Sequence, residues 1–237
     1  MTPINLIAKM IDHSVLHPTF TDYDLRKNCE IALKYDVATV CVKPYHVQMA
    51  ADLVKDSDVG VCAVIGFPHG NSRIVLKMAE TLRVIEDGAT EVDMVVNVGK
   101  VLQGDWEYVS VEIKSLNETC KNHGALLKVI FETDFITSDH DKIKLCEICS
   151  QHGVAFVKTS TGYGFVKLPD DKYTYHGATE HDVALMRKHS APEVQIKAAG
   201  GIRNIGEVLK FRELGATRIG TTSTATILEQ AKDIFRK

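Results

Sequence analysis

The sequence contains no apolar run long enough to cross a membrane and no cluster of basic residues. Its 237 residues include 28 lysines and arginines against 31 acidic residues, which gives a net charge of -3. A nucleic-acid-binding protein normally carries a basic patch or stripe, and the charges here are scattered. The N-terminal segment MTPINLIAKMIDHS lacks the basic start and continuous apolar stretch of a signal peptide. These absences predict a soluble, cytoplasmic protein with no nucleic-acid or membrane partner.

The six cysteines show no repeated spacing, and only one pair has the C-x-x-C form. That pair, Cys146 and Cys149, lies in a helical pattern, where this spacing places both residues on one helix face. A zinc or redox site would need a second pair or a strand-turn-helix context, and neither is present. The pair is therefore interpreted as structural, and reduced thiols fit the cytoplasm.

Motifs for metals and nucleotides are missing as well. None of the ten histidines belongs to an H-x-H or H-E-x-x-H motif, and no G-x-G-x-x-G or Walker A sequence follows the first expected strand. His69, in FPHGNS, is compatible either with a substrate contact or with a surface role. We therefore predict a protein without a metal or other cofactor.

The chain does have a regular alternation of short runs rich in valine and isoleucine with longer amphipathic stretches. Eight such runs in a chain of this length favour a single (β/α)8 barrel with a short N-terminal helix, in one domain spanning residues 1–237. A doubly wound sheet is the alternative, although that fold usually has a glycine-rich phosphate loop after its first strand. The expected strands begin at Ile11, Val37, Val59, Glu91, Ala125, Val154, Val194 and Ala216.

Charged residues interrupt four of these apolar strands: Asp93 in EVDMVV, Lys128 in LLKVIF, Lys158 in FVKTS and Lys197 in QIKAAG. A buried ammonium group is costly unless it is paired or loses its proton. One such lysine alone would be explained by an ion pair or by snorkelling. Four such charged residues on separate strands would converge in one barrel mouth. Three lysines and one acid do not neutralise one another. This pattern predicts chemistry rather than a purely structural ion pair.

Glycine-rich loops follow the last two strands, AAGGIR after the seventh and IGTTS after the eighth. Barrels often bind phosphate with these two loops. Gly200 and Gly201 allow backbone N–H groups to approach an anion, and Arg203, Thr222 and Ser223 add donors. The alternative is that the glycine pair only forms a tight turn before the next helix.

Taken together, these segments resemble the deoxyribose-phosphate aldolases, a family of class I aldolases. The matching segments include IDHSVL, VCVKP, VIGFPHG, EVDMVVNVG, LLKVIFET, FVKTSTGYG, IKAAGGIR and RIGTTS, and they extend from Asp12 to Ser223. The resemblance implies a (β/α)8 fold and reversible cleavage of 2-deoxy-D-ribose 5-phosphate to D-glyceraldehyde 3-phosphate and acetaldehyde, without a cofactor. It also implies a role in deoxyribonucleotide catabolism and a homodimer.

The same resemblance assigns roles to individual residues. Lys158 would form the Schiff base, with Asp93 and Lys197 as partners in proton transfer. The implied phosphate contacts are Gly200, Gly201, Ile202, Arg203, Gly220, Thr222 and Ser223. The other implied site residues are Thr161 and Gly162 in the loop after Lys158, and Asp12, Cys41 and Lys128 lining the site.

A lysine must be neutral to attack a carbonyl, and with an ordinary pKa of about 10.4 it is almost fully protonated at neutral pH. We expect the apolar strand around Lys158 and the nearby charge of Lys197 to disfavour the protonated form of Lys158.

Two features depart from the family pattern. Residues Phe165–His176 lie between the TSTG and GAT segments, and we expect them to form a longer loop that covers the mouth. The sequence ends at DIFRK, without the C-terminal tyrosine tail of some members. Two alternative functions therefore stay open: a Schiff-base aldolase acting on a longer sugar phosphate, and a sugar-phosphate-binding barrel without catalysis.

Overall fold

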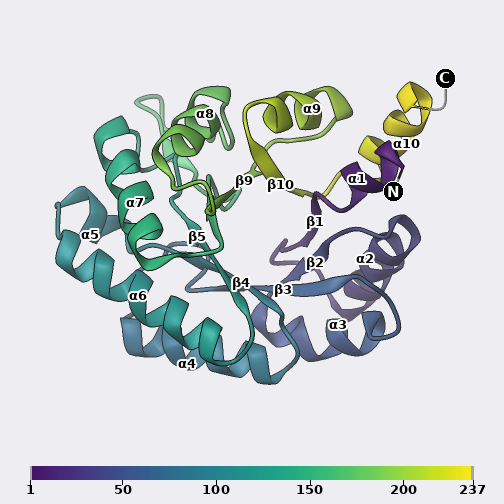
Figure 1. Ribbon diagram of the computed structural model, residues 1–237, viewed down its shortest axis with the longest axis horizontal. Coiled ribbons are helices and arrows are strands. Elements are labelled where there is room, and N and C mark those ends of the chain that lie inside the picture. The colour runs from purple at the N-terminus through teal and green to yellow at the C-terminus, as the bar shows by residue number, and fades with distance from the viewer. Residues whose placement is uncertain (1, 236–237) are drawn as a thin grey trace.

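The computed structural model describes residues 2–235, and its centre is a closed barrel of eight parallel strands (Figure 1). The last strand pairs with the first, at Ile11 with Ile219, so the sheet has no open edge. This closure confirms the predicted (β/α)8 barrel and excludes the doubly wound alternative. In order around the barrel, the strands are β1 (Ile11–Val15), β2 (Thr39–Val42), β3 (Gly60–Ile65), β4 (Glu91–Val95), β5 (Leu126–Ile130), β6 (Phe156–Lys158), β9 (Gln195–Ala199) and β10 (Ala216–Thr221).

Helices surround the barrel on its outside (Figure 1). Thr21 and Asn204 start two of them with capping boxes, in which the cap side chain and an acidic side chain satisfy each other's backbone N–H groups. The expected N-terminal helix is α1, which packs against α10. The helices are α1 (Pro3–Ala8), α2 (Asp22–Tyr35), the 3-10 turn η1 (Pro44–His46), α3 (Val47–Val54), α4 (Ile74–Glu86), α5 (Val98–Leu102), α6 (Trp106–Asn122), α7 (Asp139–His152), α8 (Glu180–His189), α9 (Ile205–Glu213) and α10 (Thr224–Phe235). Within residues 2–235, none of them is both long and apolar enough to span a bilayer.

The alternation of side chains along β4 explains how one strand serves two environments. Val92 and Met94 belong to the large apolar core between the strands and the surrounding helices. Glu91 and Asp93 point to the other face, where both lie within ion-pair distance of Lys128. Because successive side chains of a strand alternate between its faces, the outward residues stabilise the fold while the inward residues build a polar interior.

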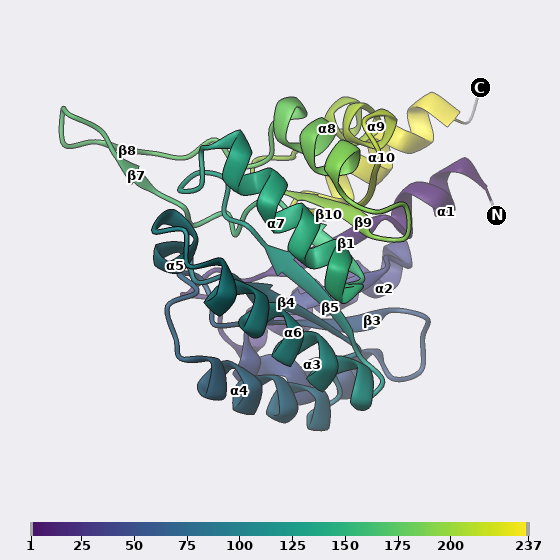
Figure 2. The same cartoon turned by 60° about the vertical axis from the view of Figure 1, so that its left-hand side comes forward.

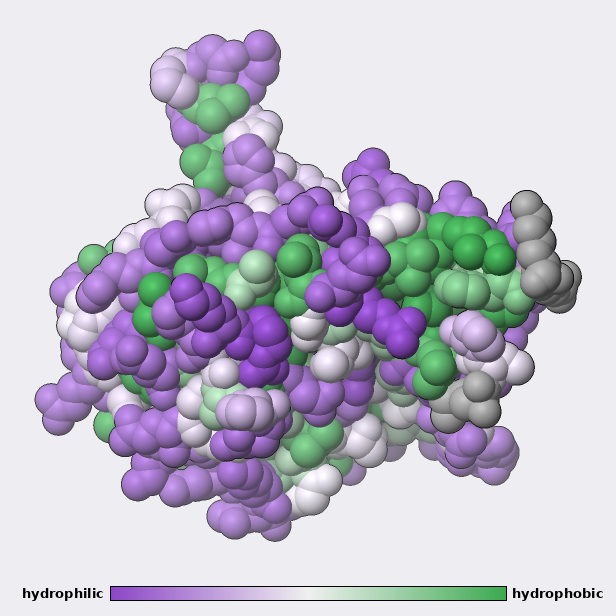
Figure 3. Space-filling model, turned by 45° about the horizontal axis from the view of Figure 1, so that its top comes forward, coloured by the Kyte–Doolittle hydropathy of each residue, from purple (hydrophilic) through white to green (hydrophobic). Residues whose placement is uncertain are grey.

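The segment Phe165–His176 does not lie across the mouth as expected. It forms an antiparallel hairpin of β7 (Val166–Lys167) and β8 (Tyr173–Thr174) that projects away from the barrel (Figure 2). In the space-filling view the projection is largely hydrophilic (Figure 3). The residues just after the hairpin contact a loop of the mouth. Ala178 N–H donates to the carbonyl of Gly200 at 3.1 Å, and a side chain on Gly177 would collide with the Gly200 backbone.

Candidate active site

Three lysines from three strands converge on the carboxylate of Asp93 inside the barrel. The Nζ atoms of Lys158 on β6 and Lys197 on β9 each lie 2.7 Å from Asp93 Oδ2. Lys128 on β5 lies 2.8 Å from the other oxygen, Oδ1. All four side chains are buried. The convergence predicted from the four interrupted strands is confirmed.

Asp12 on β1 forms a second centre of negative charge beside the first. Its Oδ2 lies 2.5 Å from the Nζ of Lys197, and its Oδ1 lies 2.6 Å from a guanidinium nitrogen of Arg218. Thr39 donates its hydroxyl to the same carboxylate at 2.8 Å. Asp12 therefore belongs to the polar interior of the barrel.

Glu91 and Arg218 complete the cluster, and the sequence analysis did not identify either. Glu91 Oε2 lies 2.6 Å from Lys128 Nζ and 2.8 Å from Arg218. The argument that three lysines face a single acid was therefore wrong. The cluster contains three carboxyl groups, three amines and one guanidinium group, so the lysines face three acids rather than one. The rule of strand parity that found Asp93 would also have found Glu91, two residues earlier on the same face.

The carboxylates of Asp12 and Asp93 are ionised at neutral pH, because nearby cations lower the pKa of both groups against the effect of burial. Burial alone would raise the pKa of Asp93, but the ammonium groups of Lys128, Lys158 and Lys197 hold it well below its usual range. Burial would likewise lower the pKa of Lys197, yet the carboxylates of Asp12 and Asp93 raise it above its ordinary value. Lys197 is therefore a fixed cation.

Lys158 differs from the other two lysines in its partners and its access. Lys128 has three carboxylates within 4 Å and Lys197 has two. Within residues 2–235, Lys158 pairs with the carboxylate of Asp93 alone. It also lines a cavity of about 380 Å³ at the carboxyl ends of the strands. Among these three lysines, Lys158 is thus the one that lines the cavity.

Most of the predicted binding residues line this same cavity. Those that do are Thr161, Gly162, Gly200, Gly201, Ile202, Arg203, Gly220 and Thr222. Ser223 follows directly, and its N–H donates to the Thr221 hydroxyl at 2.9 Å. The lining residues join the loop after Lys158 to the two glycine loops, as a ligand with a carbonyl at one end and an anion at the other would require. His69 is exposed and does not line the cavity.

The glycine loop after β9 has a backbone conformation that depends on its two glycines. Gly200 and Gly201 both have positive φ angles, +97° and +82°, which residues with side chains rarely adopt. The N–H of Arg203 is occupied, because it donates at 2.6 Å to the Glu207 carboxylate, which also completes the capping box of α9 with Asn204. Arg203 therefore has its guanidinium group, rather than its backbone, to offer to an anion.

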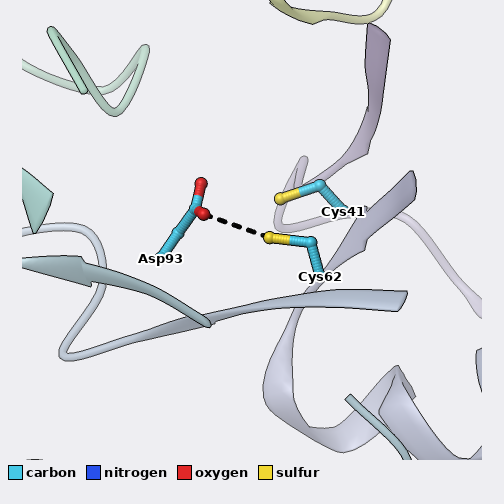
Figure 4. Close-up of side chains that lie close together, drawn as sticks. All are labelled: Cys41, Cys62 and Asp93. Carbon is cyan, nitrogen blue, oxygen red and sulfur yellow. Dashed lines mark hydrogen bonds between the residues drawn. The ribbon is translucent and has the colours of Figure 1, made fainter. Parts of the chain in front are cut away.

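Cys41, Cys62 and Asp93 lie close enough together to suggest a metal site (Figure 4). Their surroundings oppose one. The Cys62 thiol donates to Asp93 Oδ1 at 3.1 Å, and burial raises its pKa well above the ordinary value. A metal-bound cysteine must be a thiolate. Three ammonium groups already occupy the Asp93 carboxylate. These residues do not fit a metal ion. Cys41, expected to line the site, is a buried neighbour of Cys62 and is not among the residues that line the cavity.

Glu132 is a further site residue that the sequence analysis missed. It follows β5, is 1% exposed, and has a φ of +60°, which is strained for a glutamate. Its carboxylate accepts hydrogen bonds from the N–H and hydroxyl groups of Thr161. A side chain on Gly164 would collide with it, at 2.8 Å. Glu132 therefore holds the 161–164 loop in place. Its position after an expected strand, in VIFET, was an available signal.

Burial raises the pKa of Glu132 to about 7 from an ordinary value of 4.5, against the hydrogen bonds from Thr161. Between these values the folded protein keeps a proton that the unfolded chain has lost. The free energy of unfolding should therefore fall as pH rises through this range, by about 3 kcal/mol in total. Glu132→Gln should remove this dependence, and urea unfolding at about pH 5 and about pH 8 measures it. The exposed Glu118→Gln variant serves as the control. Equal pH dependence in the parent and Glu132→Gln would contradict the assignment.

Comparisons with known proteins agree with this geometry. The family model described as DeoC/LacD family aldolase matches residues 6–223. The deoxyribose-phosphate aldolase of Rhodopirellula baltica is 44% identical over 226 residues, covering 95% of this chain and 89% of that protein. The enzyme of the same name from Thermococcus gammatolerans is 44% identical over 229 residues, covering 96% and 97%.

Solved structures give the same result. A putative deoxyribose-phosphate aldolase from Coccidioides immitis is 32% identical, with a TM-score of 0.88 over 97% of this chain and 87% of that one. The deoxyribose phosphate aldolase of Aeropyrum pernix, described as a unique tetrameric structure, is 29% identical, with a TM-score of 0.85 over 98% and 93%.

Proposed function

The chain belongs to the DeoC/LacD family of aldolases, and we propose that it cleaves 2-deoxy-D-ribose 5-phosphate through a Schiff base at Lys158. The observation that carries this assignment is the contrast among the three buried lysines. Lys128 and Lys197 are held by two or more carboxylates, whereas Lys158 has one and lines the cavity. The relatives are deoxyribose-phosphate aldolases, and the reaction proposed here is the aldehyde-lyase cleavage for which they are named.

In the cleavage direction, neutral Lys158 attacks the C1 aldehyde of the open-chain sugar, a C–N bond forms and water leaves. The resulting iminium is an electron sink. Removal of the C3 hydroxyl proton breaks the C2–C3 bond, whose electron pair enters the iminium and leaves an enamine on Lys158. D-Glyceraldehyde 3-phosphate is released. Protonation of the enamine at C2 and hydrolysis of the iminium then release acetaldehyde.

Asp93 and Lys197 are suited to move the protons that this sequence requires. Asp93 Oδ2 lies 2.7 Å from Lys158 and equally close to Lys197. A carboxylate that touches both amines offers a short path between Lys158 and water in the cavity. Because Lys197 stays charged, it also prevents the full negative charge of Asp93 from stabilising protonated Lys158.

The two glycine loops would hold the phosphate of the substrate. Gly201 and Thr222 line the cavity together with Lys158, so one ligand can reach both ends. The Arg203 guanidinium would add a positive charge there. The family relationship and the single-partner lysine favour this function over a longer sugar phosphate and over a barrel without catalysis.

A cleavage assay combined with chemical trapping tests the function directly. Borohydride reduction with acetaldehyde should leave an ethyl group on Lys158, located by peptide mapping. Lys158→Arg should form no adduct and lose cleavage. Unphosphorylated 2-deoxyribose should be cleaved with a kcat/KM at least about tenfold lower, because a lost hydrogen bond to a charged group costs about 1.5–3 kcal/mol. Failure of the parent to form any adduct would reject the assignment.

The Lys197→Leu variant tests whether Lys197 weakens the interaction between the Asp93 carboxylate and protonated Lys158. Without Lys197, the Asp93 carboxylate would interact more strongly with protonated Lys158. The pH at which trapped-adduct formation reaches half its maximum should therefore rise by about one to two units. The rate of borohydride-trapped adduct formation is measured against pH in both proteins, with circular dichroism as the control for folding. Profiles that superimpose would show that Lys197 does not tune Lys158.

The quaternary state and location are part of the same proposal. We expect a homodimer in the cytoplasm. The tetrameric structure described for the Aeropyrum pernix relative supports self-association. Apolar Leu6 of α1 and Ile234 of α10, on adjoining helices, are 43% and 48% exposed. Six free, buried cysteines fit a reducing compartment. Light scattering of the purified protein should give twice the mass of one chain, and a concentration-independent monomer would contradict it.

A further inference from the structure

We propose that Tyr175, at the base of the β7–β8 hairpin, closes the phosphate end of the cavity and sets the length of the sugar phosphate that the enzyme cleaves. This inference rests on the proposed function and adds a specificity-determining residue to it. Among the residues of the hairpin segment Phe165–His176, Tyr175 is the one that lines the cavity, together with Lys158, Gly201 and Thr222.

The backbone next to Tyr175 lies directly on the glycine loop. A Cβ atom placed on Gly201 would lie 3.7 Å from the carbonyl oxygen of His176. One placed on Gly177 would lie 2.5 Å from the carbonyl oxygen of Gly200, so the two turns approach each other as closely as glycine permits. The hairpin base and the proposed phosphate loop are therefore one packed unit.

A buried acid fixes this unit to the barrel. The carboxylate of Asp134, which is 7% exposed, accepts hydrogen bonds from the backbone N–H groups of both His176 and Gly177. Asp134 follows β5, two residues after Glu132, so the hairpin base is held by the same segment that holds the 161–164 loop. Tyr175 therefore forms a fixed wall of the cavity, because the backbone next to it is hydrogen-bonded to the barrel.

The aromatic ring of Tyr175 is itself packed. It meets the ring of Phe165 edge to face, with centroids 5.4 Å apart and planes at 77°. Phe165 is at the opposite end of the hairpin segment, so the two ends of the insertion orient the ring between them. This geometry is favourable for aromatic pairs and limits the ring's freedom to move aside.

The position of this wall determines which substrates fit. One end of the ligand is fixed at Lys158, where the bond to C1 forms, and the phosphate is fixed at Gly200–Gly201. A sugar with one more carbon would push its phosphate beyond the glycine loop toward Tyr175. The structure therefore favours five-carbon 2-deoxyaldose 5-phosphates and excludes the six-carbon 2-deoxyaldose 6-phosphates.

The test compares kcat/KM for 2-deoxyribose 5-phosphate and 2-deoxyallose 6-phosphate in three variants, because this six-carbon sugar keeps the configuration at C3 and C4 and differs in length. Tyr175→Ala should reduce the preference for the five-carbon substrate at least about tenfold, because one carbon in a closed pocket is worth about 10- to 200-fold. Tyr175→Phe keeps the ring and should keep the preference. Tyr173→Ala, in the same hairpin but 64% exposed, is the matched control and should also keep it.

Two results would overturn the inference. An unchanged preference in Tyr175→Ala would show that the ring is not the wall. An equal loss in Tyr175→Phe and Tyr175→Ala would assign the effect to the hydroxyl group instead of to the ring. Borohydride-trapped acetaldehyde adduct is measured in every variant, because acetaldehyde is too short to reach Tyr175. If Tyr175→Ala forms the adduct normally and keeps the parent's substrate preference, the proposed role of Tyr175 is rejected and the proposed function stands. If the parent protein forms no adduct, the proposed function itself is rejected.

Discussion

One carboxylate, Asp93, shared by three ammonium groups is the interaction on which the site depends. Its two oxygens are contacted by Lys128, Lys158 and Lys197 at 2.7–2.8 Å. A buried carboxylate or ammonium group alone would be strongly unfavourable, and only the complete set keeps each charge compensated. The neighbouring acids Asp12 and Glu91 hold Lys197 and Lys128 further, so the lysine with least compensation is the one at the cavity.

The sequence predicted the barrel and the centre of the site because both depend on local patterns. Strand length, the alternation of side chains and glycine loops are visible within a few residues. They indicated Asp93, Lys158 and Lys197, which the structure brings together, and Gly201, which lines the cavity with Lys158. What could not be predicted depends on contacts between distant segments. The sequence does not show that Arg218 bridges Asp12 and Glu91, so the charge of the cluster was misjudged.

The hairpin illustrates the same limit. Its length and position were apparent as a departure from the family pattern, but its direction was not. A loop of polar residues can lie across a mouth or stand away from it, and the choice here is made by Asp134 and by the contact of Gly177 with Gly200. Glu132 was missed for a related reason: a glutamate in a loop is ordinary until burial and strain single it out.

The barrel closure joins residues from the two ends of the chain. Asp12 contacts Arg218, 206 positions later, and Lys197, 185 positions later. Contacts of such sequence separation cannot form until both segments have been synthesised. During synthesis on the ribosome, the N-terminal strands therefore emerge with Asp12 and Asp93 still lacking their cationic partners. A nascent or truncated chain would have to keep these acids hydrated, and the catalytic interior can become dry only when the last strand, β10, has joined β1.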